Sequence, residues 1–532
     1  MSARGLNWCD KMASTEILIQ QAISLHQQGN LVGAEAIYKK VLNVDPNDFD
    51  ALHMLGIINA QRGSFEEAEK LLRKALSVDS KVAPCFHNYG TVLAKLKRFK
   101  GAVSSYQCAI KLVPNHAPIY SDLGNALYEL KLYEEALAAY DKALALKPDL
   151  ADAWCGRGNI FYDRKRHNEA FAAYDKAIAL RPDLENAWLG RGNVFFSLNR
   201  DEEALTCFDK AISLRKDFAE CYTNKAALKL SLGEFEEGWQ LYEWRWKMKS
   251  FSSPVRNFSQ PLWLGNDSIA GKTILVHSEQ GFGDTIQFCR YVPRLKSLGC
   301  KIIFETPKPL VPLINAQMDD CQIIGRGEAL PSFDVHCPLL SLPLAFKTTI
   351  ETIPAQVPYL FPPPEKLELW RTKLGTKSKP RIGLVWSGRM LPDFRRSIPL
   401  NLLLPIIAEK AEWHSVQKEY RDDDSKSLES SLAIMDHSRF LNDFSDTAAL
   451  ITEMDLVISI DTAVAHLAGA LGKPVWILLP FHPDFRWLRE RKDSPWYPTA
   501  RLFRQAQDGE WGSVIDRVFQ ELKIFLDALS NS

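Results

Sequence analysis

Two short stretches of the sequence place a carboxylate at the start of a helix that follows a strand. The first is "HSEQGFGDTIQF" (277–288), which comes directly after an apolar run and in which Gly281 and Gly283 precede Asp284. A strand that passes through a Gly-x-Gly turn into a helix usually binds phosphate on its backbone N–H groups, yet Asp284 puts a negative charge there. Asp284 is therefore either an ordinary N-cap or a base that takes a proton from a substrate.

The second stretch is "DLVISIDTAVAHLAGALGKPVWILLP" (455–480), in which a buried strand ends at Ile460 and an apolar helix follows. Asp461 and Thr462 are suitable cap residues for that helix. The free N–H groups at its start form an anion site, to which Thr462 adds a hydroxyl donor. His466, one turn further on the same face, could reach a phosphate or sugar oxygen. The alternative is that Asp461 only caps the helix and His466 only packs inside it.

The elements that must position these residues alternate between strands and helices. Short β-branched runs lie at 273–277, 301–305, 321–324 and 333–336, and again at 381–388, 413–417, 455–460 and 474–479, with helical stretches between them. This alternation predicts parallel sheets with helices on their faces. The Pro-rich segment 353–366 divides the runs into two groups. We expect two Rossmann-like lobes, 269–366 and 378–528, with a cleft between them.

The first half of the chain repeats with a period of 34 residues. Two small positions twelve apart let paired helices approach closely, and a large residue four further on fills the space between units. The pattern resembles the tetratricopeptide repeat, with six full repeats over 15–218 and a seventh that runs out near 246. It predicts an α-solenoid over 15–250 whose concave face binds a protein or peptide. The residues that keep the step are Ala22, Gly56, Gly90, Gly124, Gly158, Gly192 and Ala226, then Ala34, Ala68, Ala102, Ala136, Ala170, Ala204 and Gly238, and the large residues Tyr38, Leu72, Tyr106, Tyr140, Tyr174, Phe208 and Tyr242.

Three asparagines, Asn125, Asn159 and Asn193, keep the same step. We expect them on the first helix of each unit, facing the groove, where they could hydrogen-bond the backbone of a bound peptide. The simpler explanation is that asparagine is a common residue of the repeat consensus.

Large aromatic residues crowd the end of the array. They are too many for an exposed cap, so we expect this stretch to pack the array against the next domain. Residues 251–268, which contain Ser and Pro, form the predicted junction. The aromatic residues are Trp239, Tyr242, Trp244, Trp246 and Trp263.

Composition excludes some classes of function. Lys and Arg number 65, as do Asp and Glu, which gives no electrostatic case for a nucleic-acid or membrane-surface partner. No apolar run is long enough for a signal peptide or a transmembrane helix, so a cytoplasmic location is expected. The ten cysteines contain no Cys-x-x-Cys pair, which favours buried free thiols over a metal site. Translation could start at Met1 or at Met12, where the first helical pattern begins.

Six motifs in the second half occur in an order that resembles a known enzyme family. They are "EQGFGDTIQF", "IGLVWSG", "RRSIPL", "VQK", "DFSDTAALI" and "SIDTAVAHLAGALGKPVWILLP". Together they resemble the catalytic domain of family 9 glycosyltransferases, the heptosyltransferase-like enzymes, and the bacterial branch that carries tetratricopeptide repeats ahead of it. The resemblance implies a two-lobed GT-B fold, inversion at the anomeric carbon, no obligatory metal and no cofactor beyond a nucleotide-diphosphate sugar as donor.

The resemblance also implies roles for single residues. The aspartate of the "GD" turn would deprotonate the acceptor from the N-terminal lobe, and Gly281 and Gly283 would support its loop. The C-terminal lobe would hold the donor. Two cations would stabilise the leaving diphosphate in place of a metal. The base is Asp284, the residues that hold the diphosphate, sugar and nucleotide are Asp461, Thr462, His466, Ser387 and Gly388, and the cations are Arg396 and Lys418.

The sequence departs from the family in two places. Relatives carry Asn-Pro and a His-containing stretch where this chain has "RMLPDFRRSIPL", which puts nucleotide contacts around 389–394 in doubt. The N-terminal lobe is short for an acceptor-binding domain, so we expect the repeats to share in acceptor recognition.

Two alternatives to an active transferase stay open. One is a protein-interaction scaffold whose transferase domain is weakly active or inactive. The other borrows from protein O-GlcNAc transferases, which also join tetratricopeptide repeats to a GT-B domain. The GD turn and the helix start at Asp461 limit that second analogy to architecture.

Overall fold

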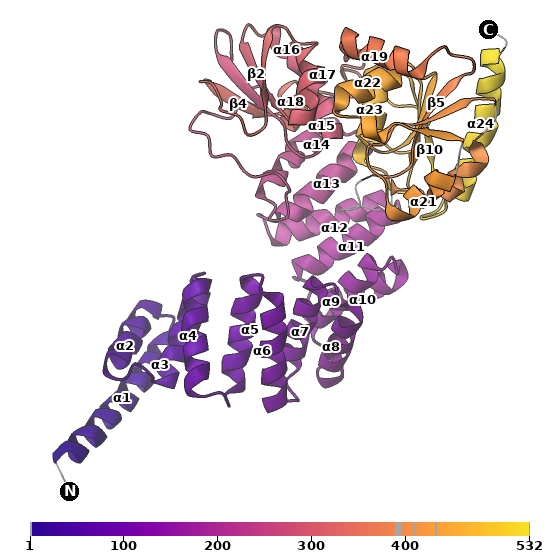
Figure 1. Ribbon diagram of the computed structural model, residues 1–532. Coiled ribbons are helices and arrows are strands. Elements are labelled where there is room, and N and C mark those ends of the chain that lie inside the picture. Colours follow the sequence, from indigo (N-terminus) through magenta and orange to yellow (C-terminus); the bar gives the residue numbers. More distant parts are fainter. Residues whose placement is uncertain (1–2, 389–395, 408–409, 431–432, 531–532) are drawn as a thin grey trace. The chain divides into compact units, whose positions relative to one another are not determined.

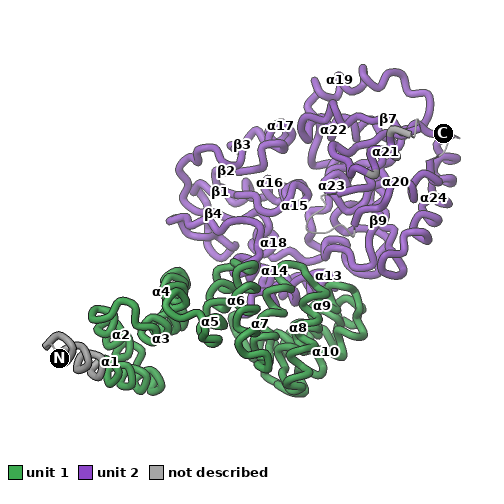
Figure 2. The backbone as a smooth tube through the Cα atoms, turned by 60° about the horizontal axis from the view of Figure 1, so that its bottom comes forward, with its two compact units in different colours: residues 1–217 green, residues 218–532 purple. Residues whose placement is uncertain are grey.

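Residues 3–388, 396–407, 410–430 and 433–530 are described by a computed structural model of the chain. The chain divides into two compact units, 1–217 and 218–532 (Figure 2). Within the described residues, unit 1 contains only helices, and unit 2 begins with helices and continues with two parallel sheets (Figure 1). The fold is an α-solenoid followed by an α/β domain, which confirms the predicted fold class.

Unit 1 consists of helix pairs that repeat the same lengths and turns. The first helix, α1, extends ahead of Met12 to Ala3, so the helical pattern begins earlier than the apolar periodicity indicates. The helices are α1 (Ala3–Gln27), α2 (Leu31–Val44), α3 (Phe49–Gln61), α4 (Phe65–Val78), α5 (Ala83–Lys95), α6 (Phe99–Leu112), α7 (Ala117–Glu129), α8 (Tyr133–Leu146), α9 (Ala151–Asp163), α10 (His167–Leu180), α11 (Glu185–Ser197) and α12 (Asp201–Leu214).

Glycine recurs in the first helices because an aromatic ring fills the space that a larger side chain at that position would need. A Cβ added at Gly124 would lie 2.6 Å from the ring of Tyr140 in the same repeat. A Cβ at Gly156, in the next repeat, would lie 2.3 Å from the same ring. Each ring therefore packs between two first helices, and no larger residue fits at either glycine. This contact holds successive repeats together.

The turns inside the repeats keep the period too. The second residue after each first helix adopts a left-handed conformation, which glycine tolerates best and which costs other residues about 1–2 kcal/mol. Lysine occupies that place in three consecutive repeats, so composition alone does not reveal it. The residues are Gly29, Gly63, Lys97, Lys131, Lys165 and Asn199 in unit 1 and Gly233 in unit 2.

The seventh helix pair belongs to unit 2. Its helices α13 (Ala219–Ser231) and α14 (Phe235–Tyr242) continue into a short 3-10 helix, η1 (Glu243–Lys247). The boundary at 217 thus falls inside the region 15–250 that the sequence assigns to the array. Trp239 and Tyr242 of α14 are buried against the α/β domain, where both rings contact Phe485.

The first sheet of unit 2 has four parallel strands in the order β3-β2-β1-β4. Its edge strand β4 also pairs with the junction, because Trp263 N–H donates to His336 O at 2.8 Å and His336 N–H donates to Pro261 O at 3.1 Å. Residues 251–268 are therefore fixed on this lobe at that point. The elements are β1 (Thr273–His277), α15 (Phe282–Phe288), η2 (Cys289–Tyr291), α16 (Val292–Lys296), β2 (Lys301–Thr306), η3 (Lys308–Leu310), α17 (Val311–Asn315), β3 (Cys321–Gly325), β4 (Val335–Pro338), η4 (Leu339–Ser341) and α18 (Leu342–Ala345).

The second sheet has six parallel strands in the order β10-β9-β8-β5-β6-β7. Helix α19 (Pro364–Leu374) precedes it. The remaining elements are β5 (Arg381–Val385), α20 (Leu400–Leu403), η6 (Leu404–Ile406), β6 (Glu412–Ser415), α21 (Asp422–Ser430), β7 (Ile434–Asp436), η7 (Ser438–Phe440), α22 (Phe444–Thr452), β8 (Leu456–Ile460), α23 (Ala463–Ala470), β9 (Val475–Leu479), η8 (Phe485–Trp487), β10 (Ala500–Arg504) and α24 (Gly512–Ser530).

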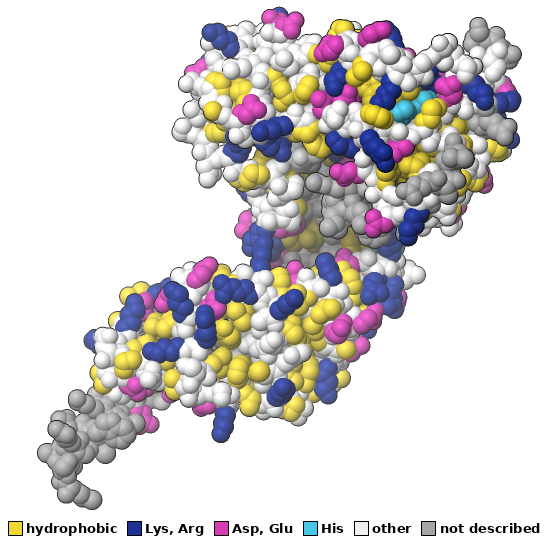
Figure 3. All heavy atoms as spheres, in the orientation of Figure 1, with side chains coloured by type: hydrophobic (Ala, Val, Ile, Leu, Met, Phe, Trp, Pro, Cys, Tyr) yellow, Lys and Arg dark blue, Asp and Glu magenta, His cyan; other side chains and the backbone are white. Residues whose placement is uncertain are grey.

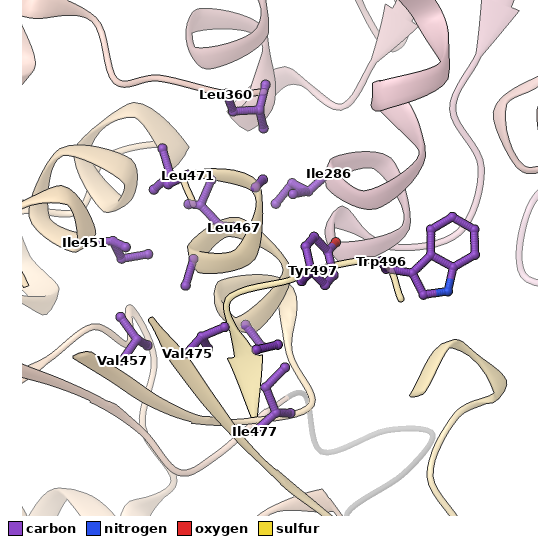
Figure 4. Close-up of a cluster of buried hydrophobic side chains, with 14 of the residues drawn as sticks. Ile286, Leu360, Ile451, Val457, Leu467, Leu471, Val475, Ile477, Trp496 and Tyr497 are labelled. Carbon is purple, nitrogen blue, oxygen red and sulfur yellow. The ribbon is translucent and has the colours of Figure 1, made fainter. Parts of the chain in front are cut away.

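The two lobes share one hydrophobic core. Trp239 of α14, Ile286 of α15 and Leu467 of α23 belong to the same cluster of buried side chains. In Figure 4 Ile286 lies beside Leu467, with Leu360 of the interlobe segment next to them. Helices α15 and α23 lie side by side in both Figure 1 and Figure 2. The core therefore joins the two helices that carry the sequence motifs.

Some elements differ from the sequence-based expectation. The sequence predicts a helical stretch between the first two strands, but Pro293 interrupts it and the structure has α15, η2 and α16 there. Two strands, β7 and β10, were not predicted. Strand β7 is only three residues long, and the sequence of β10, "ARLFR", has two arginines in five residues. Neither resembles the apolar runs of the central strands.

Three surface and composition findings complete the fold. In the described residues no helix has both the length and the apolar character needed to cross a bilayer. The nine cysteines from Cys85 to Cys337 are free thiols, and three of these, Cys108, Cys300 and Cys321, are only partly buried. On the face drawn in Figure 3, basic and acidic side chains are interspersed.

Candidate active site

Each sequence motif lies at a switch point, where the order of the strands in a parallel sheet reverses. In the first sheet β1 lies between β2 and β4, and the loop after β1 leads into α15, whose first turn carries Asp284. In the second sheet β5 lies between β8 and β6, and Asp461 follows β8. Ligands of open α/β sheets bind at such switch points, beyond the carboxyl ends of the strands. The topology thus assigns one ligand-facing loop to each lobe.

Asp284 is held at the start of α15 by two contacts. Its Oδ2 accepts a hydrogen bond from Gly281 N–H at 2.7 Å, which closes the first turn of the helix. Its Oδ1 forms an ion pair with Arg486, which comes from η8 in the other lobe. Arg486 also pairs with Asp484 at 2.6 Å. Asp284 is thus both a helix-start residue and one side of a charged contact between the lobes.

Burial and charge act on Asp284 in opposite directions. Burial raises the pKa of the Asp284 carboxyl above its ordinary value, and Arg486 and the Gly281 N–H lower it in part. The side chain keeps 18% of its exposure, so a substrate hydroxyl can reach it. A fixed, partly accessible carboxylate with a raised pKa has the properties of a general base.

The second motif forms a compact polar group at the start of α23. Asp461 is 4% exposed, and its Oδ1 lies 3.8 Å from His466 Nε2. Nδ1 of His466 hydrogen-bonds the Tyr497 hydroxyl at 3.0 Å, and the imidazole stacks on Trp487. Burial holds the pKa of His466 well below its ordinary value, so the ring is neutral near pH 7. Burial and the charge of Asp484 raise the pKa of Asp461.

The N–H groups at the start of α23 are available to a ligand. Thr462 occupies the N-cap position, but its side chain makes no capping hydrogen bond to the N–H groups of the first turn. The Thr462 hydroxyl points to Ser459 Oγ at 3.2 Å. Thr462, Ala463 and Val464 are only partly buried. Partial positive charge at this helix start favours an anion.

Gly283 brings the two motifs together. A Cβ at Gly283 would lie 2.9 Å from His466 Cδ2, and Ala463 Cα would be 3.5 Å away. The loop of the first motif therefore packs directly on the first turn of α23, which only glycine permits. Gly281, the other glycine of the turn, instead supplies the N–H that binds Asp284. The two glycines have different tasks.

Ser387 and Gly388 follow β5, next to the second motif. A Cβ at Gly388 would lie 3.4 Å from Thr462 Cγ2, so the two loops touch. Ser387 is fixed by Gln417, whose Oε1 accepts from Ser387 N–H at 2.8 Å and whose amide donates to Ser387 Oγ at 3.0 Å. The contacts expected around 389–394 lie outside the described residues.

The two predicted cations have different surroundings. Arg396 donates to Asp461 O at 3.3 Å and lies 3.8 Å from its Oδ2, with 35% of the side chain exposed. Lys418 is exposed and donates to Asn442 O at 3.1 Å. Arg396 therefore contacts the second motif, whereas Lys418 contacts a different loop, at Asn442. The role of Lys418 against a diphosphate stays a prediction.

Several residues that complete this group were not found from the sequence. Arg486, Asp484 and Trp487 follow β9 in "FHPDFRW", and Tyr497 lies in the next loop. Only their position after β9 could have indicated them, because β9 is a neighbour of β8 and the carboxyl ends of both strands lie at the same edge of the sheet. No recognisable spacing marks them. Arg486 Nε, buried beside the group, has no hydrogen-bond partner among the described residues.

The asparagines of the repeat array lie in unit 1. Asn125 Oδ1 accepts from the Tyr140 hydroxyl at 2.7 Å, and Asn159 Oδ1 accepts from Tyr174 at 2.8 Å. These bonds support the large residue of the same repeat, which gives the asparagines a structural task. Asn193 occupies the equivalent place on α11. A peptide contact for all three stays a prediction.

No group of three or more His, Cys, Asp or Glu residues among those described could hold a metal ion. A cavity of about 530 Å³ lies between α14 and residues 349–351, and no residue of the polar group lines it. The candidate site is therefore identified by its polar contacts.

Comparisons with known proteins agree with the two-part architecture. Models of the tetratricopeptide repeat match residues 25–84, 124–163, 158–198 and 192–233. A model of glycosyltransferase family 9 (heptosyltransferase) matches residues 442–483, which include the second motif. The chain therefore contains tetratricopeptide repeats and a segment similar to family 9 glycosyltransferases. Its enzyme class is supported at the family level over that segment.

One curated relative covers a longer stretch. The chain is 25% identical over 326 residues to Protein FlbA of Caulobacter vibrioides, a match that covers 55% of this chain and 53% of that protein. The chain thus spans about half the length of this relative.

Two solved structures are similar to part of the chain. A tetratricopeptide repeat protein from Parabacteroides merdae is 22% identical, with 43% of this chain and 91% of that chain covered and a TM-score of 0.39. MamA is 26% identical, with 30% and 94% covered and a TM-score of 0.29.

The contact between Asp284 and Arg486 predicts energetic coupling between the lobes. We compare Asp284→Asn, Arg486→Met and the double mutant in a double-mutant cycle. The free energy of unfolding of the double mutant should differ by about 1–3 kcal/mol from the value that the sum of the two single effects gives, because either substitution alone leaves the partner residue without its counter-charge. Urea unfolding of unit 2, followed by tryptophan fluorescence, measures the four states.

A matched cycle controls for general effects of losing a buried arginine. Arg381 is also buried, but it bonds Glu412 and the end of α19. Asp284→Asn with Arg381→Met should be additive within about 0.5 kcal/mol. Additivity in the Arg486 cycle as well would show that the ion pair does not join the lobes.

Proposed function

We propose that unit 2 transfers a sugar from a nucleotide-diphosphate sugar to a protein, peptide or glycan acceptor, with inversion and without an obligatory metal, on a GT-B-type fold. The observation that carries this proposal is the meeting of the two switch-point loops through Gly283 on His466 and Arg486 on Asp284. A carboxylate from one lobe thereby lies beside an open helix N-terminus from the other. Sugar transfer needs both at one place.

In the proposed reaction Asp284 takes the proton of the acceptor hydroxyl as the hydroxyl oxygen attacks the anomeric carbon. The bond from that carbon to the diphosphate oxygen breaks, and the electron pair leaves with the nucleoside diphosphate. The ion pair with Arg486 keeps Asp284 ionised and oriented before the attack. Attack on the face opposite the leaving group accounts for inversion.

The leaving diphosphate requires positive charge. The N–H groups at the start of α23 and the guanidinium of Arg396 support this role, because Arg396 lies against Asp461 at the same helix start. Arg486 adds a buried N–H without a partner among the described residues. The neutral His466, bonded to Tyr497, can donate or accept one hydrogen bond to the sugar or phosphate without adding charge. Thr462 adds a hydroxyl.

Substitutions at the two aspartates should separate catalysis from binding. Asp284→Asn keeps a hydrogen-bond acceptor for Gly281 N–H but removes the base, so we expect release of nucleoside diphosphate to fall by about 100-fold or more while binding persists. Asp461→Ala should instead weaken binding. The measurements are product release from a panel of UDP-, GDP-, ADP- and dTDP-sugars and thermal shifts with the free nucleoside diphosphates.

A control tests whether loss of any helix-start carboxylate has this effect. Asp48 accepts from Ala51 N–H at 2.8 Å at the start of α3 in unit 1. Asp48→Asn should change neither reading. Unchanged product release in Asp284→Asn would leave Asp284 as only a helix-start residue. If no donor is used and no nucleoside diphosphate stabilises the wild type, the scaffold alternative is favoured.

The repeats are proposed to recruit the acceptor. Support comes from the small first lobe, whose sheet has only four strands in the described residues, and from the repeat architecture, whose concave face is suited to an extended chain. The analogy with protein O-GlcNAc transferases covers this joining of repeats and transferase and extends no further. We also propose that the protein is located in the cytoplasm.

Removal of unit 1 tests this recruitment. Deletion of residues 1–217 should leave nucleoside diphosphate binding within about twofold, since all site residues lie in unit 2. Transfer of labelled sugar to macromolecules of a cell lysate should fall by about tenfold or more because the effective acceptor concentration is lost. Labelling that is unchanged by the deletion would contradict a role for the repeats.

A further inference from the structure

The four residues that precede the first turn of α15 have a conformation that needs outside support. Gln280 has φ of 59°, a left-handed conformation that costs a residue with a side chain about 1–2 kcal/mol. Glu279, directly before it, is a carboxylate with 1% exposure inside unit 2. A strained turn and a buried charge persist only where neighbouring groups fix both. The neighbours therefore decide where Asp284 lies.

The main neighbour is Arg245, in η1 at the end of the seventh repeat. Its Nε and Nη2 both donate to Glu279 Oε1, at 3.1 and 2.7 Å, and the side chain is 1% exposed. Nη2 also donates to Ser341 Oγ at 2.8 Å, and Nη1 donates to Tyr242 O at 3.1 Å. A guanidinium with these fixed partners clamps the loop at Glu279.

A second contact from the same helix pair holds the strained residue. The Gln280 amide donates to the Tyr242 hydroxyl at 2.8 Å, and Gln280 N–H donates to Ser253 Oγ at 2.8 Å. Arg326, beyond β3, donates to Ser278 O at 2.9 Å. The loop is thus tied at three successive residues, and the ties at Glu279 and Gln280 come from outside the four-stranded sheet.

The same helix also contacts the other half of the site. The rings of Trp239 and Tyr242 pack on Phe485, and Phe485 directly precedes Arg486, the partner of Asp284. Helix α14 therefore contacts Gln280, four residues before Asp284, and Phe485, directly before Arg486. Contacts that served only to attach a repeat to a lobe would not need to converge on these two loops.

We infer that Arg245 and Tyr242 are positioning residues for Asp284, so that the seventh repeat is a structural part of the transferase site. This inference rests on the proposed function for its catalytic consequence. Arg245 fixes Glu279, Tyr242 fixes Gln280, and together they set the direction in which the helix start presents the carboxylate. In this role each residue acts through the loop, without contacting the acceptor or the donor.

The experiment compares four variants of the full chain with the wild type. Arg245→Met removes the clamp, Arg245→Lys keeps one charge, and Tyr242→Phe removes a single hydroxyl with the ring retained. Arg381→Met removes an arginine that is equally buried but bonds Leu374, Gly375 and Glu412. Two quantities are measured: hydrogen exchange of the amides of 279–284, and release of nucleoside diphosphate from the UDP-, GDP-, ADP- and dTDP-sugar panel.

The inference predicts a local change with a catalytic effect. Exchange at 279–284 should become about tenfold faster in Arg245→Met and Tyr242→Phe, with β8 and α23 unchanged. The kcat for product release should fall by about tenfold or more with the donor KM within about twofold, because a displaced base affects the reaction and leaves donor binding intact. Arg245→Lys should recover part of both. Arg381→Met should change neither reading at the loop.

Other results would overturn the inference. Unchanged exchange at 279–284 in both Arg245→Met and Tyr242→Phe would show that neither residue holds the loop. Faster exchange with an unchanged kcat would show that Arg245 and Tyr242 hold the loop but do not position Asp284 for the reaction. An equal effect of Arg381→Met would assign the change to general destabilisation. If the wild type releases no product from any donor, the proposed function fails, and the exchange data alone decide whether the seventh repeat holds the loop.

Discussion

The close packing of the two helix starts, α15 on α23, is the contact on which the rest of unit 2 depends. Each helix start carries partial positive charge, so their approach is unfavourable unless anions lie between them. Asp284 and Asp461 supply that negative charge, Arg486 bridges to Asp284, and Gly283 leaves room for His466. The residues that make this packing possible are also those whose chemistry a sugar transfer requires. Stability and proposed function therefore depend on the same contact.

The seventh repeat is the second element that this contact requires. Helix α14 and η1 carry repeat-type sequence, yet their side chains enter the same hydrophobic core as the two lobes and bond the loop before Asp284. The seventh helix pair and the α/β domain thus belong to one compact unit, and this pair supplies bonds to the loop from outside the four-stranded sheet. This arrangement explains why so many large aromatic residues gather between 239 and 263.

Much of this architecture could be predicted from the sequence because it has simple physical periods. A step of 34 residues revealed the repeats, and β-branched runs revealed the central strands, which are buried on both faces. Both motifs could be identified because each follows such a strand. Arg486 could not, because it follows β9 through a loop without a characteristic spacing, and its contact joins residues 202 positions apart. The bond from Lys418 to Asn442 likewise depends on a side-chain direction that no period encodes.

We propose that a nucleoside diphosphate binds where the two helix starts meet. Hydrogen exchange of the full chain, with and without a saturating nucleoside diphosphate that stabilises it, locates the ligand directly. We expect slower exchange at the amides of 461–465, at the start of α23, and at 281–284, with the amides of unit 1 unaffected. Protection confined to unit 1 or to the cavity beside residues 349–351, with no change at α23, would contradict it.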